Sequence, residues 1–152
     1  MSSKKIQAFL FNNLINLSSY CARSEKLNLL TKGLMRMFGA MALIVNGGKE
    51  KTSLMEIGQE WQRMFPAKKS LPIVKVEDNT LYAEIRLQCP LRGTGDLSAC
   101  NKMMEYDRKL LEKIGGKLVV LRSQAEPNTE FCQLAIRTSS DSRDDLVPAH
   151  KR

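Results

Sequence analysis

The chain has 152 residues, 43% of them hydrophobic, and a formal net charge of +8, so it can bury one core and requires no second domain. Four irregularly spaced cysteines in a chain of this size exclude a small disulfide scaffold and favour a reducing compartment, which makes the cytoplasm the expected location. Five of the eight excess positive charges fall in residues 1–48, without an aromatic RNA-binding motif or a helix-turn-helix. We therefore expect a solvated basic face and no specific nucleic acid partner.

Two amphipathic helices are predicted before the Gly47-Gly48 pair. Their predicted apolar stripes are Ile6, Leu10, Leu14, Leu17 and Cys21 in the first, and Leu27, Leu30, Leu34, Phe38, Met41 and Val45 in the second. These helices are expected to form a scaffold and the surface of a homodimer. The methionines of the second helix could line that surface, although methionines at helical spacing are more often ordinary packing residues. The longest apolar stretch, residues 34–45, contains Arg36 and is shorter than the roughly 20 residues of a membrane span, so no transmembrane segment is predicted.

A third helix is expected to begin at the capping-box sequence of residues 53–56 and to end before Pro66. Residues 73–76 should then pair with residues 81–87 across a turn at Asp78-Asn79. From Thr80 onward apolar and polar residues alternate as far as residue 89, which predicts a strand with an inward-facing Cys89 at its end.

The remaining pattern predicts one helix over residues 97–114, capped by Asp96 or Ser98, then strands at 117–122 and 131–137. A strand, a long helix and a second strand favour a right-handed parallel crossover, which brings the ends of both strands and the start of the helix to one edge. The expected fold class is α+β, with a helical layer (1–66) packed on a small, mostly antiparallel sheet in a ββαββ unit (71–137). Residues 138–152, which include the lone His150, are expected to be a mobile tail.

Three cysteines meet at that predicted edge: Cys89, Cys100 and Cys132. They could be ordinary core side chains, since free cysteine is commonly buried. Alternatively they form a functional site, in which the helix N-terminus would make Cys100 the most reactive thiol, or in which all three would bind zinc. Their spacing is not that of a paired C-x-x-C motif, and no fourth ligand is evident.

Asp107 lies on the apolar seam of the fourth predicted helix, where a hydrophobic residue would be expected. A charge at that position needs a partner. It could pair with Arg92 or Arg122 or bond a neighbouring loop as a structural group, or it could act as a general base or substrate anchor. Its distance from Cys100, roughly 10 Å along a helix axis, makes a shared metal ion improbable.

The loop before this helix contains Arg92, Gly93 and Gly95. Its amides and the guanidinium could receive a carboxylate or phosphate at the helix N-terminus. The glycines could equally serve only to permit the turn, and the loop has no Gly-Lys-Ser/Thr as a P-loop would.

Four segments in the last third of the chain resemble the L-2-amino-thiazoline-4-carboxylic acid hydrolase-like family and, more distantly, the 4-vinyl reductase small-molecule-binding domains. The segments are Cys89-Pro90-Leu91, Met104-Glu105-Tyr106-Asp107, Gly115-Gly116-Lys117-Leu118 and residues 125–132. Cys89, Asp107 and Cys132 fit the family's positions, whereas Met104 stands where the family has a helix cysteine, and the final turn is not glycine-rich.

The resemblance implies a 4-vinyl-reductase-like fold and a hydrolase of C–N bonds with a cysteine and aspartate site, acting on a small cyclic amidine or thiazoline carboxylate. It would use Cys89 or Cys132 as the nucleophile or thiolate ligand and Asp107 for the proton, and Arg92, with Gly93 and Gly95, would bind the substrate. The alternative is a non-catalytic small-molecule-binding or sensor module with a thiol or zinc site.

Overall fold

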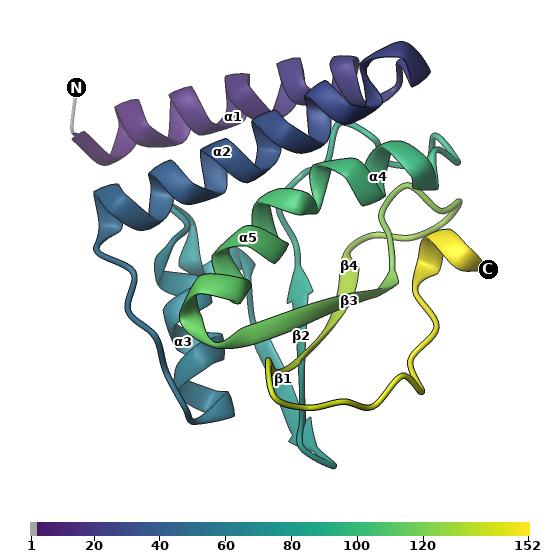
Figure 1. Ribbon diagram of the computed structural model, residues 1–152. Helices are drawn as coiled ribbons and strands as arrows, with labels where there is room; N and C mark the ends of the chain where they lie inside the picture. The colour runs from purple at the N-terminus through teal and green to yellow at the C-terminus, as the bar shows by residue number, and fades with distance from the viewer. Residues whose placement is uncertain (1–2) are drawn as a thin grey trace.

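The computed structural model describes residues 3–152 (Figure 1). Its α-helices are α1 Ser3–Ala22, α2 Asn28–Asn46, α3 Leu54–Arg63, α4 Leu97–Met103 and α5 Glu105–Ile114. Its strands are β1 Ile73–Glu77, β2 Thr80–Ile85, β3 Gly116–Arg122 and β4 Cys132–Thr138. The α+β class and the small sheet beneath N-terminal helices are therefore confirmed.

The four strands form one sheet in the order β1-β2-β4-β3, and every neighbouring pair is antiparallel. The hairpin at Asp78 and Asn79 is confirmed, and both residues have the positive φ (48° and 52°) that such a tight turn requires. β2 and β3 run in the same direction, as the predicted crossover requires, and β4 inserts between them, antiparallel to both. Both strands therefore end at the edge where β4 begins.

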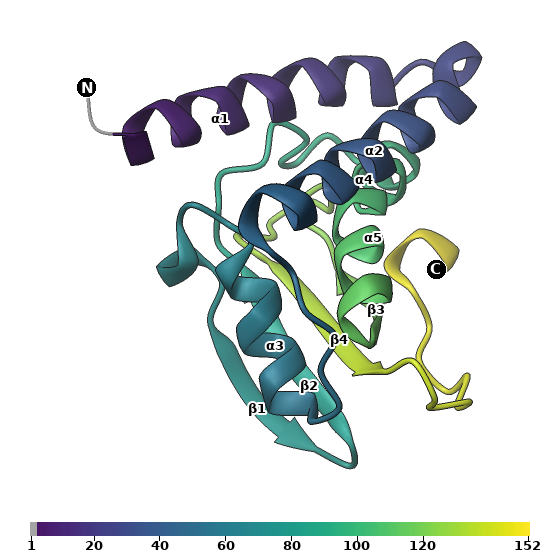
Figure 2. The same cartoon turned by 60° about the vertical axis from the view of Figure 1, so that its left-hand side comes forward.

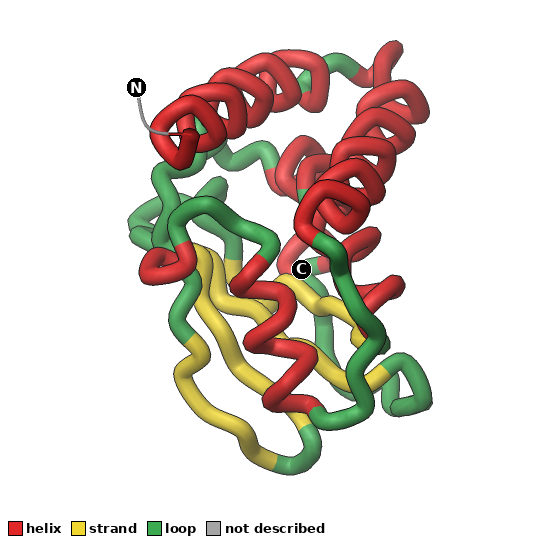
Figure 3. Tube along the Cα trace, turned by 90° about the vertical axis from the view of Figure 1, so that its left-hand side faces the viewer, coloured by secondary structure: helices red, strands yellow, loops and turns green. Residues whose placement is uncertain are grey.

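The core lies on one face of the sheet, where inward side chains of the three longer strands line up across the register. Leu81, Ile136 and Leu118 form one row, and Ala83, Leu134 and Val120 form the next. α3 and α5 pack on this face, as Figure 3 shows for α3. α3 begins at the expected residue, but Ser53 makes no side-chain cap bond, so the predicted capping box was wrong in that detail.

The single helix predicted over residues 97–114 breaks at Met104 into α4 and α5. Asp96 caps α4 as predicted, its Oδ1 accepting from Ala99 N at 2.8 Å. At the break, the Asn101 carbonyl accepts from the Arg108 guanidinium at 2.9 Å, so a side chain occupies an acceptor that the next helical turn would otherwise use. The break places Asp107 in the first turn of α5.

The predicted inward stripes of α1 and α2 were wrong in part. Leu14 of α1 lines the interior and Phe38 of α2 packs against the core, as predicted. Leu10 and Leu17, however, are 60% and 65% exposed, and Phe11 and Ile15 line the interior in their place. In α2 the buried residues are Thr31, Met35 and Gly39, because close packing on α5 selects small or flexible side chains over bulky ones. Figure 2 shows α1 lying on the helical layer, away from the sheet. The homodimer through these helices stays a prediction.

Residues Glu25–Asn46 are long and apolar enough, by length and composition, to cross a membrane. Within this fold, however, the same helix packs against α5. Its Arg36 donates to Glu105 at 3.0 Å and to Glu112 at 2.6 Å, which ties the helix to α5 by charge as well.

The tail, predicted to be mobile, packs against the rest of the chain. Arg137 makes a bidentate pair with Asp145 at 2.6 and 2.9 Å, and the short helix Ala149–Lys151 returns to the side of α4 (Figure 1). Ala149 is only 2% exposed. His150 lines a small hollow beside α4 together with Cys100.

Gly39 lies where α2 packs closely against α5. A Cβ there would lie 2.8 Å from the Tyr106 carbonyl oxygen, so we expect Gly39→Ala to lower the free energy of unfolding by about 1–3 kcal/mol. Gly33 in the same helix has open space around it, and Gly33→Ala should stabilise by about 0.5–1 kcal/mol through helix propensity. Urea unfolding of both variants measures the difference; equal effects would contradict the close approach.

Candidate functional site

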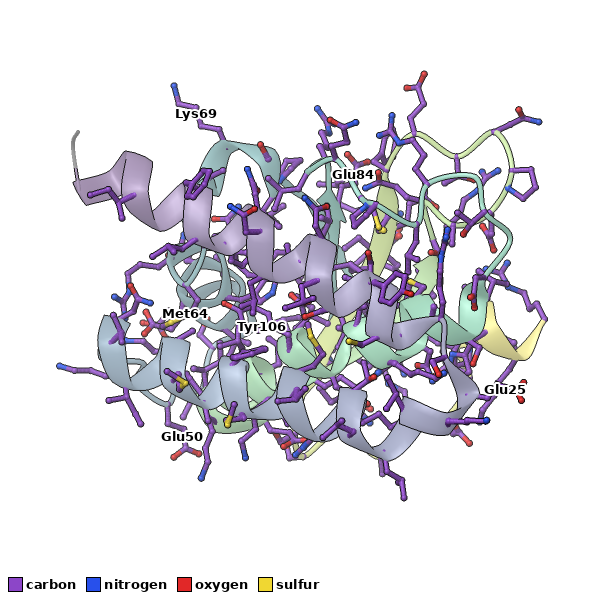
Figure 4. The ribbon with its side chains drawn as sticks, turned by 90° about the horizontal axis from the view of Figure 1, so that it is seen from above. Glu25, Glu50, Met64, Lys69, Glu84 and Tyr106 are labelled. Atoms are coloured by element: carbon purple, nitrogen blue, oxygen red, sulfur yellow. The ribbon has the colours of Figure 1, made fainter. Side chains whose placement is uncertain are left out.

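A cavity of about 90 Å³ lies between α1, the start of α5 and the edge of the sheet where β4 begins. In the view from above, Tyr106 lies between α1 and α2 over this region (Figure 4). The lining side chains are almost all apolar or sulfur-bearing: Phe11, Leu14, Ile15, Met35, Phe65, Ile85, Leu87, Gln88, Cys89, Leu91, Cys100, Met103, Met104, Tyr106, Asp107, Gln124 and Cys132.

The three thiols singled out in the sequence all line this cavity, and each comes from a different element. Cys132 opens β4 and pairs in register with Ile85, the last residue of β2. Cys100 lies in α4. Cys89 was predicted to end a strand but lies in the loop after β2, which reaches Ile85 and no further.

Each thiol sulfur accepts one hydrogen bond. The donors are Leu91 N to Cys89 at 3.4 Å, Ser123 Oγ to Cys100 at 2.9 Å and Gln124 N to Cys132 at 3.4 Å. These bonds stabilise a thiolate less than burial destabilises it. Burial therefore raises the pKa of Cys100 to about 11 and that of Cys132 to about 12, and it also raises the pKa of Cys89.

The prediction that the helix N-terminus activates Cys100 is therefore wrong. α4 is short, the Cys100 N–H is already bonded to the Asp96 carbonyl, and the side chain is buried. All three thiols carry their protons at neutral pH.

Asp107 contributes the carboxylate of the cavity and is 5% exposed. Neither Arg92 nor Arg122 pairs with it, contrary to the structural alternative drawn from the sequence; Trp61 Nε1 donates to its Oδ1 at 2.9 Å instead. Burial raises the pKa of Asp107 to about 6, and the Trp61 bond and the charge of Arg108 lower it only in part. The carboxyl group can therefore exchange a proton near neutral pH.

Gln124 organises the wall of the cavity and was missed by sequence reasoning, because no periodicity marks a polar residue in a hairpin loop. It is fully buried. Its Nε2 donates to the carbonyls of Ile85 and Leu87 at 3.1 and 2.9 Å, and its Oε1 accepts from Cys89 N at 3.3 Å. Gln124 thereby joins the β3–β4 loop to the segment that carries Cys89.

The anion site predicted at Arg92, Gly93 and Gly95 does not form. Gly93 N and Gly95 N donate to the carbonyls of Gln124 and Ala125, each at 2.8 Å, so neither amide is available to a ligand. The Arg92 guanidinium bonds Gln124 Oε1 at 3.0 and 3.1 Å and does not line the cavity. These glycines serve the turn, with φ of 67° and 74°.

Cys89, Cys100 and Cys132, the predicted zinc ligands, line one cavity. Among the residues for which the structure gives side chains, no group of three or more His, Cys, Asp or Glu that could hold a metal ion is found. Zinc binding stays a prediction.

A second, more polar hollow of about 400 Å³ adjoins the cavity between α1 and the loop after β2, which reaches up to α1 in Figure 2. Phe11, Ile15, Leu87, Gln88 and Cys89 line both spaces, and Asn12, Asn16 and Pro90 complete the outer one. We name the two spaces the inner cavity and the vestibule. Cys89, which is partly exposed, lies where they meet.

The raised thiol pKa of Cys89 predicts how it alkylates. Cys89 and Cys21 are both partly exposed and should react with iodoacetamide before the buried Cys100 and Cys132. Because burial raises its pKa, the rate at Cys89 should still be increasing above pH 9. Mass spectrometry of each cysteine peptide follows this, with Cys21 as the internal control. A rate at Cys89 that levels off near pH 7 would contradict the assignment and restore a nucleophilic role.

Comparison of the chain with protein-family models, curated proteins and solved structures found no match.

Proposed function

We propose that the protein is a small-molecule-binding module that takes up an apolar or amphipathic ligand through the vestibule into the inner cavity. The observation that carries this proposal is Asp107: a carboxyl group buried in an apolar cavity at a cost in stability, joined to solvent through a partly polar hollow. A carboxyl group with a perturbed pKa in an apolar cavity is the kind of group around which binding and catalytic sites are built.

Binding is favoured over hydrolysis because nucleophilic catalysis needs a thiolate and these thiols are protonated. The thiazoline carboxylate that the family resemblance implies would also need a cation, and Arg92 faces away from the cavity. Turnover of a cyclic amidine that disappears in Asp107→Asn would instead support the hydrolase.

Ligand uptake can be tested with butanol as a neutral probe. At ten times its Kd, a ligand that binds only the folded state stabilises it by about 1.4 kcal/mol, which for a chain of this length is about 4 °C in Tm. Butanol should also slow alkylation of Cys89, at the junction, and leave Cys21 unchanged.

A matched pair of variants in α1 locates the effect. Ile15 lines both spaces, so Ile15→Trp should block the passage and abolish both responses. Leu17, two residues away and 65% exposed, lines neither space, so Leu17→Trp should respond as the unmodified protein does. Equal responses from the two variants would contradict the assigned passage.

A further inference from the structure

We infer that the ligand of the inner cavity is a small organic monocation: a short apolar body with one protonated or quaternary nitrogen that lies against the Asp107 carboxylate. This inference rests on the proposed function and adds to it the charge of the ligand.

The charge along the ligand's route supports a cation. Among the residues whose side chains the structure describes, Asp107 is the one charged group that lines the inner cavity, and the polar groups that the vestibule adds, Asn12 and Asn16, are neutral. An anion would meet a carboxylate and no counterion. A neutral ligand would leave that carboxylate uncompensated in an apolar space, which is the costly arrangement.

Among the described residues, no cationic side chain forms an ion pair or hydrogen bond with Asp107. The nearby Arg108 is bonded to Glu105 and to Asn101, each at 2.9 Å or less. Arg92 is bonded to Gln124. Trp61, the one hydrogen-bonding side chain at Asp107 in the described chain, is a neutral donor. A ligand with a charged N–H or a quaternary nitrogen would complete the pairing.

Aromatic rings provide a second surface for a cation. Phe11, Phe65 and Tyr106 line the cavity and pack edge to face, with ring centroids 5.6 to 6.1 Å apart. Aromatic faces attract ammonium groups, most strongly where water is excluded. An apolar cavity of about 150 Å³ can hold benzene, so the inner cavity, at about 90 Å³, suits a short aliphatic amine.

The test compares butylamine, butanol and butyrate, which share a chain and differ in charge. Trp61 is the only tryptophan, and its indole N–H donates to Asp107, so its single indole resonance reports contact at the carboxylate. We expect butylamine to shift this resonance saturably and to bind about tenfold or more tighter than butanol at pH 8, with butyrate weaker than both. In Asp107→Asn the preference should vanish while butanol still binds.

A pH titration of the unmodified protein tests, without any substitution, whether the preference for butylamine depends on the charge of Asp107. Of the titratable groups around Asp107, Tyr106, Cys100, Cys132 and Cys89 have pKa values raised by burial, and His150, beyond Cys100, has a lowered pKa. Arg108 is the neighbouring basic side chain. Asp107 is the group that both lines the inner cavity and has a pKa of about 6, so the preference for butylamine should decline as the pH falls through that value.

Equal affinity for butylamine and butanol, or a preference that survives both Asp107→Asn and low pH, overturns the cationic ligand and leaves the binding module standing. Failure of all three probes to bind overturns the binding module and with it the ligand class.

Discussion

Gln124→Ala is expected to lower the free energy of unfolding by about 3–5 kcal/mol, since the change opens a cavity and leaves buried backbone groups without partners. The Gln124 amide satisfies the carbonyl of Ile85, the last residue of β2, and the Leu87 carbonyl and Cys89 N–H in the loop that follows. Without these bonds the loop that carries Cys89 should also lose its position.

Gln133→Ala is the matched control, because Gln133 is an exposed glutamine on β4 and its replacement should change stability by less than about 0.5 kcal/mol. Urea unfolding measures both variants, and the alkylation rate of Cys89 reports the loop: it should rise in Gln124→Ala alone. A loss below 1 kcal/mol for Gln124→Ala would show that the loop does not depend on this side chain.

Asp107→Asn is expected to stabilise the protein at alkaline pH. A carboxyl group whose pKa rises from 3.8 to about 6 on folding favours the unfolded state as the pH rises, because the unfolded chain releases its proton first. The penalty is absent below pH 4, develops between pH 4 and 6 and then stays constant at about 3 kcal/mol. Asparagine cannot ionise and retains an oxygen that can accept from Trp61 Nε1.

The difference in unfolding free energy between Asp107→Asn and the unmodified protein should therefore grow from near zero at pH 4 to about 3 kcal/mol at pH 8. Urea unfolding across this range measures it. Glu112→Gln is a control on the same helix: the pKa of Glu112 is lowered by its bond to Arg36, so this variant should lose stability above pH 5. A flat difference for Asp107→Asn would mean that the carboxyl group titrates normally in the fold.

Local patterns in the sequence were sufficient to predict where the helices and strands lie and that the three thiols come together. Two-residue alternation located β2, glycine and Asp-Asn signals located the turns, and helical spacing located α4 and α5. Cys89, Cys100 and Cys132 could be brought to one cavity because strand direction limits where the ends of β2 and β3 can lie. That expectation held although β4 lies between the two strands, since an inserted antiparallel strand leaves their directions the same.

The same patterns failed where packing between elements determines which side chains are buried and how their pKa values shift. The inward face of α2 carries Thr31, Met35 and Gly39, which hydrophobicity alone does not select, because the fit against α5 depends on size and approach distance. Cys100 was expected to be activated by a helix terminus, but the desolvation that dominates its pKa depends on neighbours remote in sequence.

By itself, the sequence determined which segments become helices and strands and that a carboxylate, Asp107, would interrupt an apolar seam, because both follow from short-range spacing. The tertiary structure decided what that carboxylate meets: Trp61 in place of an arginine, a cavity under α1, and a wall held by Gln124. The physical reason is that desolvation and hydrogen-bond pairing depend on groups brought together from distant parts of the chain. The spacing of residues within one segment does not predict which groups those are.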